Sequence, residues 1–242
     1  MTREPQLRNQ TVVVIGGSSG IGLETARLTR AEGADVIITA RDPDRLHRAG
    51  LELGANIAAF DATDFERLER FFDELPAPID HVLVTGPGPY YAPLAEVDLD
   101  EARRDIEAHL LLPVEVARNA VGKVRAGGTL LFMGGTSGRS TGPGLVLIAA
   151  LTAAQPALTK DLALELAPIR VNLIAAGFVD TPLSADILGD KLDARREKLR
   201  TTLPIGRVVG PADIAALAVH LMANTAVTGA TYDIDGGQKL VA

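Results

Sequence analysis

A glycine-rich turn near the start of the chain has the spacing Gly-x-x-x-Gly-x-Gly, in the segment Val14-Ile15-Gly16-Gly17-Ser18-Ser19-Gly20-Ile21-Gly22. A run with strand character precedes it, and apolar residues at helical spacing follow it from Ile21 to Glu32. Such a turn lets the backbone approach a pyrophosphate, and the helix amino-terminus offers unpaired N–H groups and positive potential. A lone glycine cluster could be only a tight turn. The flanking strand and helix favour dinucleotide binding.

Three side chains could move a proton. Tyr90 and Tyr91 close a Pro-Gly-rich segment, and His109 stands beside leucines in a helical segment. A phenol can act as a general acid, and an imidazole can donate a proton near neutral pH. The tyrosines could instead pack the loop or a subunit contact, and His109 could be a hydrogen-bonded core residue.

Thiol and metal chemistry have no support in the sequence. The chain has no cysteine, which excludes disulfides, thiolate metal sites and a thiol nucleophile. His47, His81 and His220 are scattered, and we expect no metal site.

The amino-acid composition argues against some classes of binding partner. The 242 residues are 47% apolar, enough for a sizeable core, and the net charge of -7 argues against nucleic acid. The basic cluster Arg195, Arg196, Lys198 and Arg200 is interleaved with acids, as in a solvated helix face. No apolar run has membrane-spanning length, and the start of the chain does not resemble a signal peptide. We expect a cytoplasmic protein with a small-molecule substrate and neither nucleic acid nor membrane as a partner.

The remaining pattern alternates short apolar runs with helical segments. The predicted strands are Thr11–Ile15, Asp35–Thr39, Asn56–Phe60, His81–Thr85, Gly128–Met133, Arg170–Ala175 and Ala230–Ile234. The predicted helices are Ile21–Glu32, Asp44–Leu53, Phe65–Leu75, Asp98–Val121, Pro143–Ala167, Lys191–Thr201 and Pro211–Ala223. Asp64 and Asp98 stand where helix N-caps belong, and Pro211 suits a first helical position.

This alternation predicts one α/β domain over 11–242, after a polar N-terminal extension over 1–10. The expected fold is doubly wound, with a seven-stranded parallel sheet and helices on both faces. Ligands in such folds bind beyond the carboxyl ends of the strands, so 86–93 and 134–144 should line the site. The segment 176–190 should form a lid.

The chain resembles the short-chain dehydrogenase/reductase family from about residue 10 to its end. The glycine turn is similar to that family's Thr-Gly-x-x-x-Gly-Ile-Gly, with Ile15 in place of the threonine. Later matches are Asp61, Ile169-Arg170-Val171-Asn172, Asp180-Thr181-Pro182, Thr228-Gly229 and Asp235-Gly236-Gly237. The resemblance implies a Rossmann-type fold whose cofactor contacts are Gly16, Ser18, Ser19, Gly20, Ile21, Gly22, Arg41, Asp61, Ala62, Thr85, Gly86, Gly177, Val179 and Thr181.

The resemblance also implies NADP(H) as the cofactor. In that family an acidic residue at the end of the second strand selects NAD by holding the ribose 2′-hydroxyl. This chain has Ala40 there, followed by Arg41, whose guanidinium can pair with a 2′-phosphate. Arg41 could also be an ordinary surface arginine at a strand end.

The catalytic positions depart from the family pattern of asparagine, serine, tyrosine and lysine. Aligning Tyr-x-x-x-Lys on the chain places Ile148 at the tyrosine and Thr152 at the lysine. Gly135 then falls at the serine and His109 at the asparagine. Ile148 has no proton to give, and Thr152 cannot lower the pKa of a phenol. The catalytic residues are therefore unknown, with His109, Tyr90 and Tyr91 as candidates.

The loop Thr85-Gly86-Pro87-Gly88 also departs from the family, which usually has Asn-Asn-Ala-Gly. The asparagine that ties neighbouring strands together is absent, which leaves the geometry of this loop open.

Three classes of function remain. The first is an NADP(H)-dependent oxidoreductase of short-chain dehydrogenase type, with a non-standard active site and a small, weakly polar substrate. An iminium or activated alkene would suit such a site better than a ketone. The second is a redox-silent NADP(H)-binding protein, acting as a sensor or partner subunit. The third is a non-redox lyase or cyclase on the same fold.

The helix predicted over Pro143–Ala167 is apolar around much of its circumference. A helix covered only by a sheet needs one apolar stripe, so the surplus predicts a second buried face. In the resembled family this helix packs against its mate, so we expect a homodimer or homotetramer.

Overall fold

The computed structural model describes residues 6–241 and contains a seven-stranded parallel sheet in the order β3-β2-β1-β4-β5-β6-β7. The strands are β1 (Thr11–Ile15), β2 (Asp35–Ala40), β3 (Asn56–Ala59), β4 (Ile79–Val84), β5 (Val124–Gly135), β6 (Arg170–Ala176) and β7 (Thr231–Ile234). The strand order reverses between β1 and β4, and this switch point is where ligands of open α/β sheets bind. The predicted fold class is confirmed.

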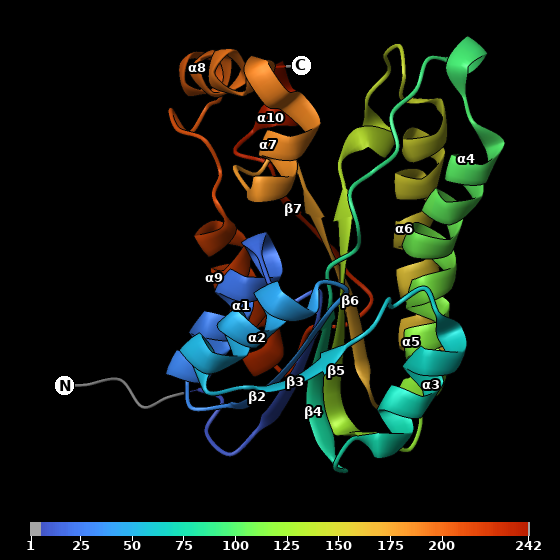
Figure 1. Cartoon of the computed structure of the whole chain (residues 1–242), viewed down its shortest axis with the longest axis vertical. Coiled ribbons are helices and arrows are strands. Elements are labelled where there is room, and N and C mark those ends of the chain that lie inside the picture. Colours follow the sequence, from blue (N-terminus) through green and yellow to red (C-terminus); the bar gives the residue numbers. More distant parts are fainter. Residues whose placement is uncertain (1–5, 242) are drawn as a thin grey trace.

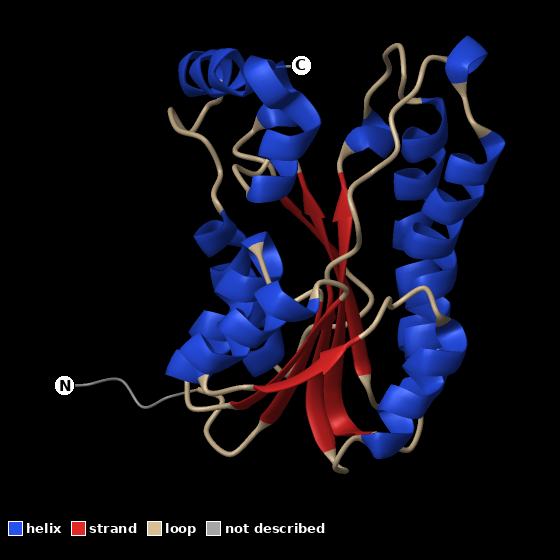
Figure 2. Cartoon of the chain, in the orientation of Figure 1, coloured by secondary structure: helices blue, strands red, loops and turns tan. Residues whose placement is uncertain are grey.

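Helices cover both faces of the sheet (Figures 1 and 2). One layer contains α1, α2 and α9, and the other contains α3 to α6; α7, α8 and α10 lie beyond the carboxyl ends of β6 and β7. The bounds are α1 (Gly20–Ala31), α2 (Pro43–Leu53), α3 (Phe65–Glu74), α4 (Leu99–Ile106), α5 (Leu112–Ala120), α6 (Val146–Glu165), α7 (Pro182–Leu188), α8 (Leu192–Thr202), α9 (Pro211–Ala223) and α10 (Gln238–Val241). Short 3-10 turns are η1 (Leu94–Glu96), η3 (Ser137–Arg139) and η4 (Gly189–Lys191).

Two predicted helices differ from those observed. The predicted helix Asp98–Val121 is divided into α4, a π-helical turn η2 (Glu107–Leu111) and α5. The predicted helix Pro143–Ala167 begins only at Val146, because Gly144 has a φ of 80° and cannot continue a right-handed helix. The segment predicted as a lid contains α7.

Local capping fixes several helix starts as the sequence predicts. The carboxylate of Asp64 accepts the backbone N–H of Arg67 at 3.0 Å. That of Asp98 accepts the N–H groups of Asp100 and Glu101 at 2.8 and 3.0 Å. Pro211 is the first residue of α9. These side chains satisfy donors that a helix cannot pair internally.

Each face of the sheet has its own buried apolar cluster. One gathers Phe71, Phe72 and Val116 from α3 and α5, and the other gathers Leu46 and Ile214 from α2 and α9. Of the predicted N-terminal extension, residues 1–5 lie outside the described residues. Leu7 is fully buried in the second cluster, so the described end of this extension packs onto the domain.

None of the helices in residues 6–241 is long and apolar enough to cross a membrane.

Candidate cofactor cleft and active site

The glycine turn joins the carboxyl end of β1 to the start of α1. Gly16 has a φ of 91°, and a Cβ there would lie 2.2 Å from the Thr85 hydroxyl. A Cβ on Gly22 would lie 2.1 Å from the carbonyl oxygen of Gly16. Ser19 caps α1 in an extended conformation without a side-chain hydrogen bond to the helix, so the first-turn N–H groups are not capped by a side chain. These features fit a diphosphate seated on the helix amino-terminus.

Thr85 replaces the strand-tying asparagine that the sequence lacks. Its hydroxyl contacts the carbonyl oxygens of Ile15 at 3.0 Å and Gly16 at 3.2 Å, and its own N–H donates to Ile15 at 2.9 Å. The end of β4 is thereby tied to β1 and to the glycine turn. The loop geometry that the sequence left open is thus fixed by a different side chain.

A cleft of about 990 Å³ extends from the glycine turn to the ends of β2 and β3. It is lined by the predicted contacts Gly16, Ser18, Ser19, Gly20, Ile21, Gly22, Arg41, Asp61, Ala62, Thr85, Gly86 and Thr181. Arg41 is 69% exposed, and its guanidinium lies 4.0 Å from Asp61, too far for a hydrogen bond. The carboxylate of Asp42 caps α2 by accepting the N–H of Arg45 at 2.9 Å. Arg41 thus remains open to an incoming phosphate.

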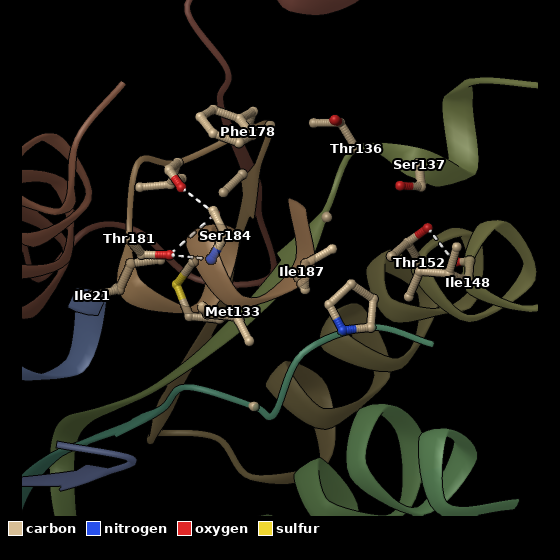
Figure 3. Close-up of a pocket in the computed structure, with 18 of the residues that line it drawn as sticks. Ile21, Met133, Thr136, Ser137, Ile148, Thr152, Phe178, Thr181, Ser184 and Ile187 are labelled. Carbon is tan, nitrogen blue, oxygen red and sulfur yellow. Dashed lines mark hydrogen bonds between the residues drawn. The ribbon is translucent and has the colours of Figure 1, made fainter. Parts of the chain in front are cut away.

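A second cavity, of about 560 Å³, continues this cleft beyond the ends of β4, β5 and β6 (Figure 3). Ile21, Gly86 and Thr181 border both spaces. In Figure 3, Thr136, Ser137, Ile148 and Thr152 line one side of the cavity, with Phe178, Thr181 and Ser184 across from them. Gly177 and Val179 line the same cavity. A cofactor can therefore extend from the cleft into the cavity.

His109 lines this cavity from the π-helical turn between α4 and α5, a type of turn that is frequent at functional sites. Its Nδ1 lies 2.9 Å from Oδ1 of Asp105 and 3.0 Å from the Asp105 carbonyl oxygen. Both are acceptors, so Nδ1 carries a hydrogen and Nε2 is left to exchange a proton. A Cβ built on Gly86 would lie 3.9 Å from that Nε2, which places it beside the loop after β4.

Asp105 controls the charge of His109. Burial of His109 lowers its pKa, but hydrogen bonding and the negative charge of Asp105 together outweigh burial and raise the pKa above its usual 6.5. The side chain of Asp105 is only 3% exposed. Its Oδ1 also accepts the N–H of Tyr90 at 3.3 Å, which orients the carboxylate. Asp105 therefore favours the protonated form of His109 beside the cavity.

The two tyrosine candidates lie differently. The hydroxyl of Tyr90 accepts the N–H of Asp98 at 2.9 Å and lies 3.5 Å from the carbonyl oxygen of Glu96. Tyr90 lines the first cleft and not the cavity that holds His109. Tyr91 does line that cavity, and burial together with the negative charge of Asp105 raises the pKa of Tyr91, against the opposing charge of Arg195. Tyr91 is thus a neutral hydrogen-bonding group at the cavity wall.

The positions that the resemblance assigns to the serine, tyrosine and lysine have no free donor. Ile148 lines the cavity with an aliphatic side chain. The hydroxyl of Thr152 donates to the carbonyl oxygen of Ile148 at 2.7 Å, within α6 (Figure 3). A Cβ on Gly135 would lie 3.2 Å from the Thr152 methyl group. Among the described residues, no lysine lines this cavity.

Sequence reasoning missed two residues of the candidate site. Asp105 lies four residues before His109, a spacing that places both on one helix face, so the sequence carried this signal. Arg195 was assigned to a solvated helix face, yet it lines the cavity, and its guanidinium carbon lies 5.7 Å from the centre of the Phe178 ring. No sequence signal separates Arg195 from its basic neighbours on α8.

The fold and cleft define a dinucleotide-binding protein, and comparisons with known proteins identify its family. The family model described as enoyl-(acyl carrier protein) reductase matches residues 15–239. The chain belongs to the short-chain dehydrogenase/reductase family of oxidoreductases.

Three similar proteins illustrate this relation. The short-chain dehydrogenase/reductase ATR9 of Stachybotrys chlorohalonatus is 28% identical over 98% of this chain and 99% of its own length. The MalC reductase/Diels-Alderase of Malbranchea aurantiaca superimposes with a TM-score of 0.86 at 27% identity, over 98% of this chain and 99% of that one. A small-chain dehydrogenase in complex with NADPH superimposes with a TM-score of 0.82 at 28% identity, over 96% of this chain and 99% of that one. A nicotinamide cofactor is thus found in a related structure.

Proposed function

We propose that the protein is an NADP(H)-dependent oxidoreductase that reduces a polarised double bond in a small, mostly apolar substrate. When bound, NADPH supplies a hydride. The cleft offers the glycine turn for the diphosphate and Arg41 for the 2′-phosphate, and the adjoining cavity offers His109 as a proton donor. Gly177, Val179 and Thr181 would border the nicotinamide end of the cofactor.

The His109–Asp105 pair is the observation that carries this proposal. The raised pKa of His109 means that its imidazole stays protonated to a higher pH than an unperturbed histidine. In the reduction, one carbon of the double bond gains a hydride, and Nε2 of His109 gives its proton to the atom that receives the electron pair. His109 becomes neutral and regains a proton from solvent. Asp105 orients the ring and stabilises the imidazolium.

Tyr91 and Ser137 have a smaller part in this proposal. Both line the cavity with a hydroxyl group. They can bind a polar group of the substrate without transferring a proton. Tyr90 is left out of the chemistry, because its hydroxyl lies against the backbone of the loop at 96–98.

The test is oxidation of NADPH, followed by its absorbance, with a panel of aldehydes, ketones, conjugated enones and cyclic imines. Stoichiometric oxidation with product formation supports the proposal. NADPH binding with no turnover of any compound would favour a redox-silent protein. Turnover with no NADPH consumed would indicate a lyase or cyclase, an outcome worth testing because the similar MalC protein is named a reductase/Diels-Alderase.

Cofactor choice has its own test. An arginine–phosphate contact is a charge-assisted hydrogen bond, which contributes about 1.5–3 kcal/mol, or roughly tenfold to a hundredfold in affinity. NADPH should therefore bind more tightly than NADH, and Arg41→Ala should remove most of that preference. Arg48→Ala serves as a control, since Arg48 is on α2 but does not line the cleft. Equal affinity of the unmodified protein for both cofactors would contradict the assignment to NADP(H).

We also propose that the protein functions as a homodimer or homotetramer. The helical layer of α4 to α6, with its flanking turns, exposes large apolar side chains: Leu94, Leu99, Ile106, Leu111, Val121, Val146 and Leu164. Leu164 of α6 is 79% exposed, and Leu99 of α4 is 65% exposed. A second copy would cover this surface. Light scattering at micromolar concentration should give at least twice the mass of one chain, and a monomer would contradict the assembly.

A further inference from the structure

The cavity beside His109 has an unusual charge distribution for this chain. The protein has 31 acidic and 24 basic residues, yet among the described residues no aspartate or glutamate lines the cavity. The one lysine or arginine that lines it within 6–241 is Arg195, from α8. Arg195 and the imidazole of His109, which pairs with Asp105 behind the cavity wall, are therefore the groups of this lining that can carry positive charge.

Arg195 has no partner within the described residues, unlike the other arginines of its helix. Arg196 forms a two-oxygen contact with Asp180, with its Nη2 2.8 Å from Oδ1, and also contacts Asp193. Arg200 pairs with Glu197 at 3.0 Å. Arg195 makes no hydrogen bond or ion pair there, and its guanidinium contacts the ring of Phe178 instead. The guanidinium is therefore available to a ligand.

The neighbouring ion pair fixes where Arg195 points. Asp180 follows β6, and its N–H donates to the Val209 carbonyl oxygen at 2.9 Å. Because Arg196 holds α8 to this anchored carboxylate, the adjacent residue Arg195 is turned toward the cavity. Arg195 does not line the cleft that contains the glycine turn and Arg41. It therefore lies where the substrate would bind, away from the region proposed for the cofactor's phosphates.

We propose that the substrate carries a carboxylate that pairs with Arg195. The planar guanidinium fork matches the two oxygens of a carboxylate. The hydroxyl-bearing side chains of Tyr91 and Ser137 line the same cavity as Arg195 and offer two neutral donors to a bound ligand. Leu183, Ile187 and Leu188 form an apolar wall on the lid side. The ligand class is therefore a small apolar molecule with one carboxylate, its reducible bond next to His109.

This inference rests on the proposed function, because it assigns the cavity to the substrate. The probes are 3-phenylpropionate and its uncharged amide, 3-phenylpropionamide, titrated calorimetrically into the NADPH-loaded protein. The carboxylate should bind roughly tenfold to a hundredfold more tightly, as for other charge-assisted contacts. Arg195→Gln should bring the two dissociation constants together, whereas Arg195→Lys should keep part of the difference. Arg200→Gln, on the same helix but outside the cavity lining, should behave like the unmodified protein.

The affinity for NADPH is measured for each variant alongside the probes. Lost discrimination in Arg195→Gln with unchanged NADPH binding supports the proposal. Equal affinity of the unmodified protein for the two probes, binding of neither at millimolar concentration, or full discrimination in Arg195→Gln would overturn it. If the unmodified protein does not bind NADPH, the proposed function fails, and the same probe titration without cofactor still decides whether Arg195 selects a carboxylate.

Discussion

Two buried histidines at opposite ends of the sheet show how one side chain acquires two roles. His81 lies near the amino end of β4 and is 1% exposed, while His109 lies beside the cavity at the carboxyl end and is 9% exposed. Nε2 of His81 lies 2.6 Å from the Gln10 side-chain oxygen, and its Nδ1 is buried without a partner among the described residues. His109 has the Asp105 carboxylate at 2.9 Å from Nδ1.

This difference in hydrogen-bond partners determines which charge state each imidazole favours. Burial lowers the pKa of His81 to about 3; the charges of Arg170 and Arg125 add to this, and Asp80 opposes it. His81 is therefore neutral at physiological pH and has a structural role. For His109 the contacts with Asp105 outweigh burial and raise the pKa. In the proposed function, the histidine that serves as proton donor is the one with a carboxylate partner and an open cavity, since burial alone favours the neutral form.

The largest expected effect comes from removing the donor. His109→Gln should lower kcat for NADPH-dependent reduction about 10²- to 10⁴-fold, the usual contribution of a general acid. The affinity for NADPH should change little, because His109 does not line the first cleft. Tyr90→Phe is the matched control, and its rate should stay near that of the unmodified protein. If His109→Gln lowers kcat by less than about tenfold, His109 is not the general acid.

The second test removes the charge of the partner and keeps its shape. In Asp105→Asn the carboxylate charge is lost while burial and the backbone hydrogen bond at residue 105 remain, so the pKa of His109 should fall. The rate at pH 8 should then drop about tenfold for each unit by which the pKa falls, while the rate at low pH changes much less. A pH–rate profile checks this shift. A uniform loss at every pH would show that Asp105 only supports the fold.

The third test concerns the other end of the sheet and is an effect on stability. The pKa of His81 is about 3 in the folded state and 6.5 when unfolded, so its contribution is fully present above pH 6.5 and is lost as pH falls below that value. At pH 5 the loss corresponds to about 2 kcal/mol. The free energy of unfolding in urea is measured at pH 7 and pH 5 for the unmodified protein and for His81→Gln. This loss of stability at pH 5 should appear in the unmodified protein and be absent from His81→Gln. Equal pH dependence in both would contradict a neutral His81.

The smallest expected effect is the contribution of His109 to stability, which depends on pH in the opposite direction to that of His81. Because its folded pKa lies above 6.5, its pairing stabilises the protein fully below pH 6.5, and this contribution is lost as pH rises through the folded pKa. The same unfolding measurements at pH 6 and pH 9 should therefore show a loss in the unmodified protein that is absent from His109→Gln. If His109 instead made the protein more stable toward pH 9, the claim that its pKa is raised in the folded state would be contradicted.

The sequence predicted the parts of the molecule that depend on local pattern. The strand, glycine turn and helix around Gly16 and Gly22 follow from residue spacing, as do the caps at Asp64 and Asp98. Asp105 was missed although its spacing to His109 is visible, because the π-helical turn and the burial of both groups are tertiary features. The orientation of Arg195 depends on the contact of Arg196 with Asp180, between residues sixteen apart in the chain. The different charges of His81 and His109 likewise depend on neighbours that periodicity does not reveal.

The most direct test of the central claim is the pKa of His109 in the NADPH-loaded protein. Nuclear magnetic resonance of the four histidines, labelled at the imidazole ring and assigned with His81→Gln and His109→Gln, gives a titration curve for each. We predict that His109 titrates above pH 6.5 and that its pKa falls in Asp105→Asn, while His81 does not titrate between pH 5 and pH 8. A His109 that titrates below 6.5, or whose pKa is unchanged in Asp105→Asn, would contradict the account.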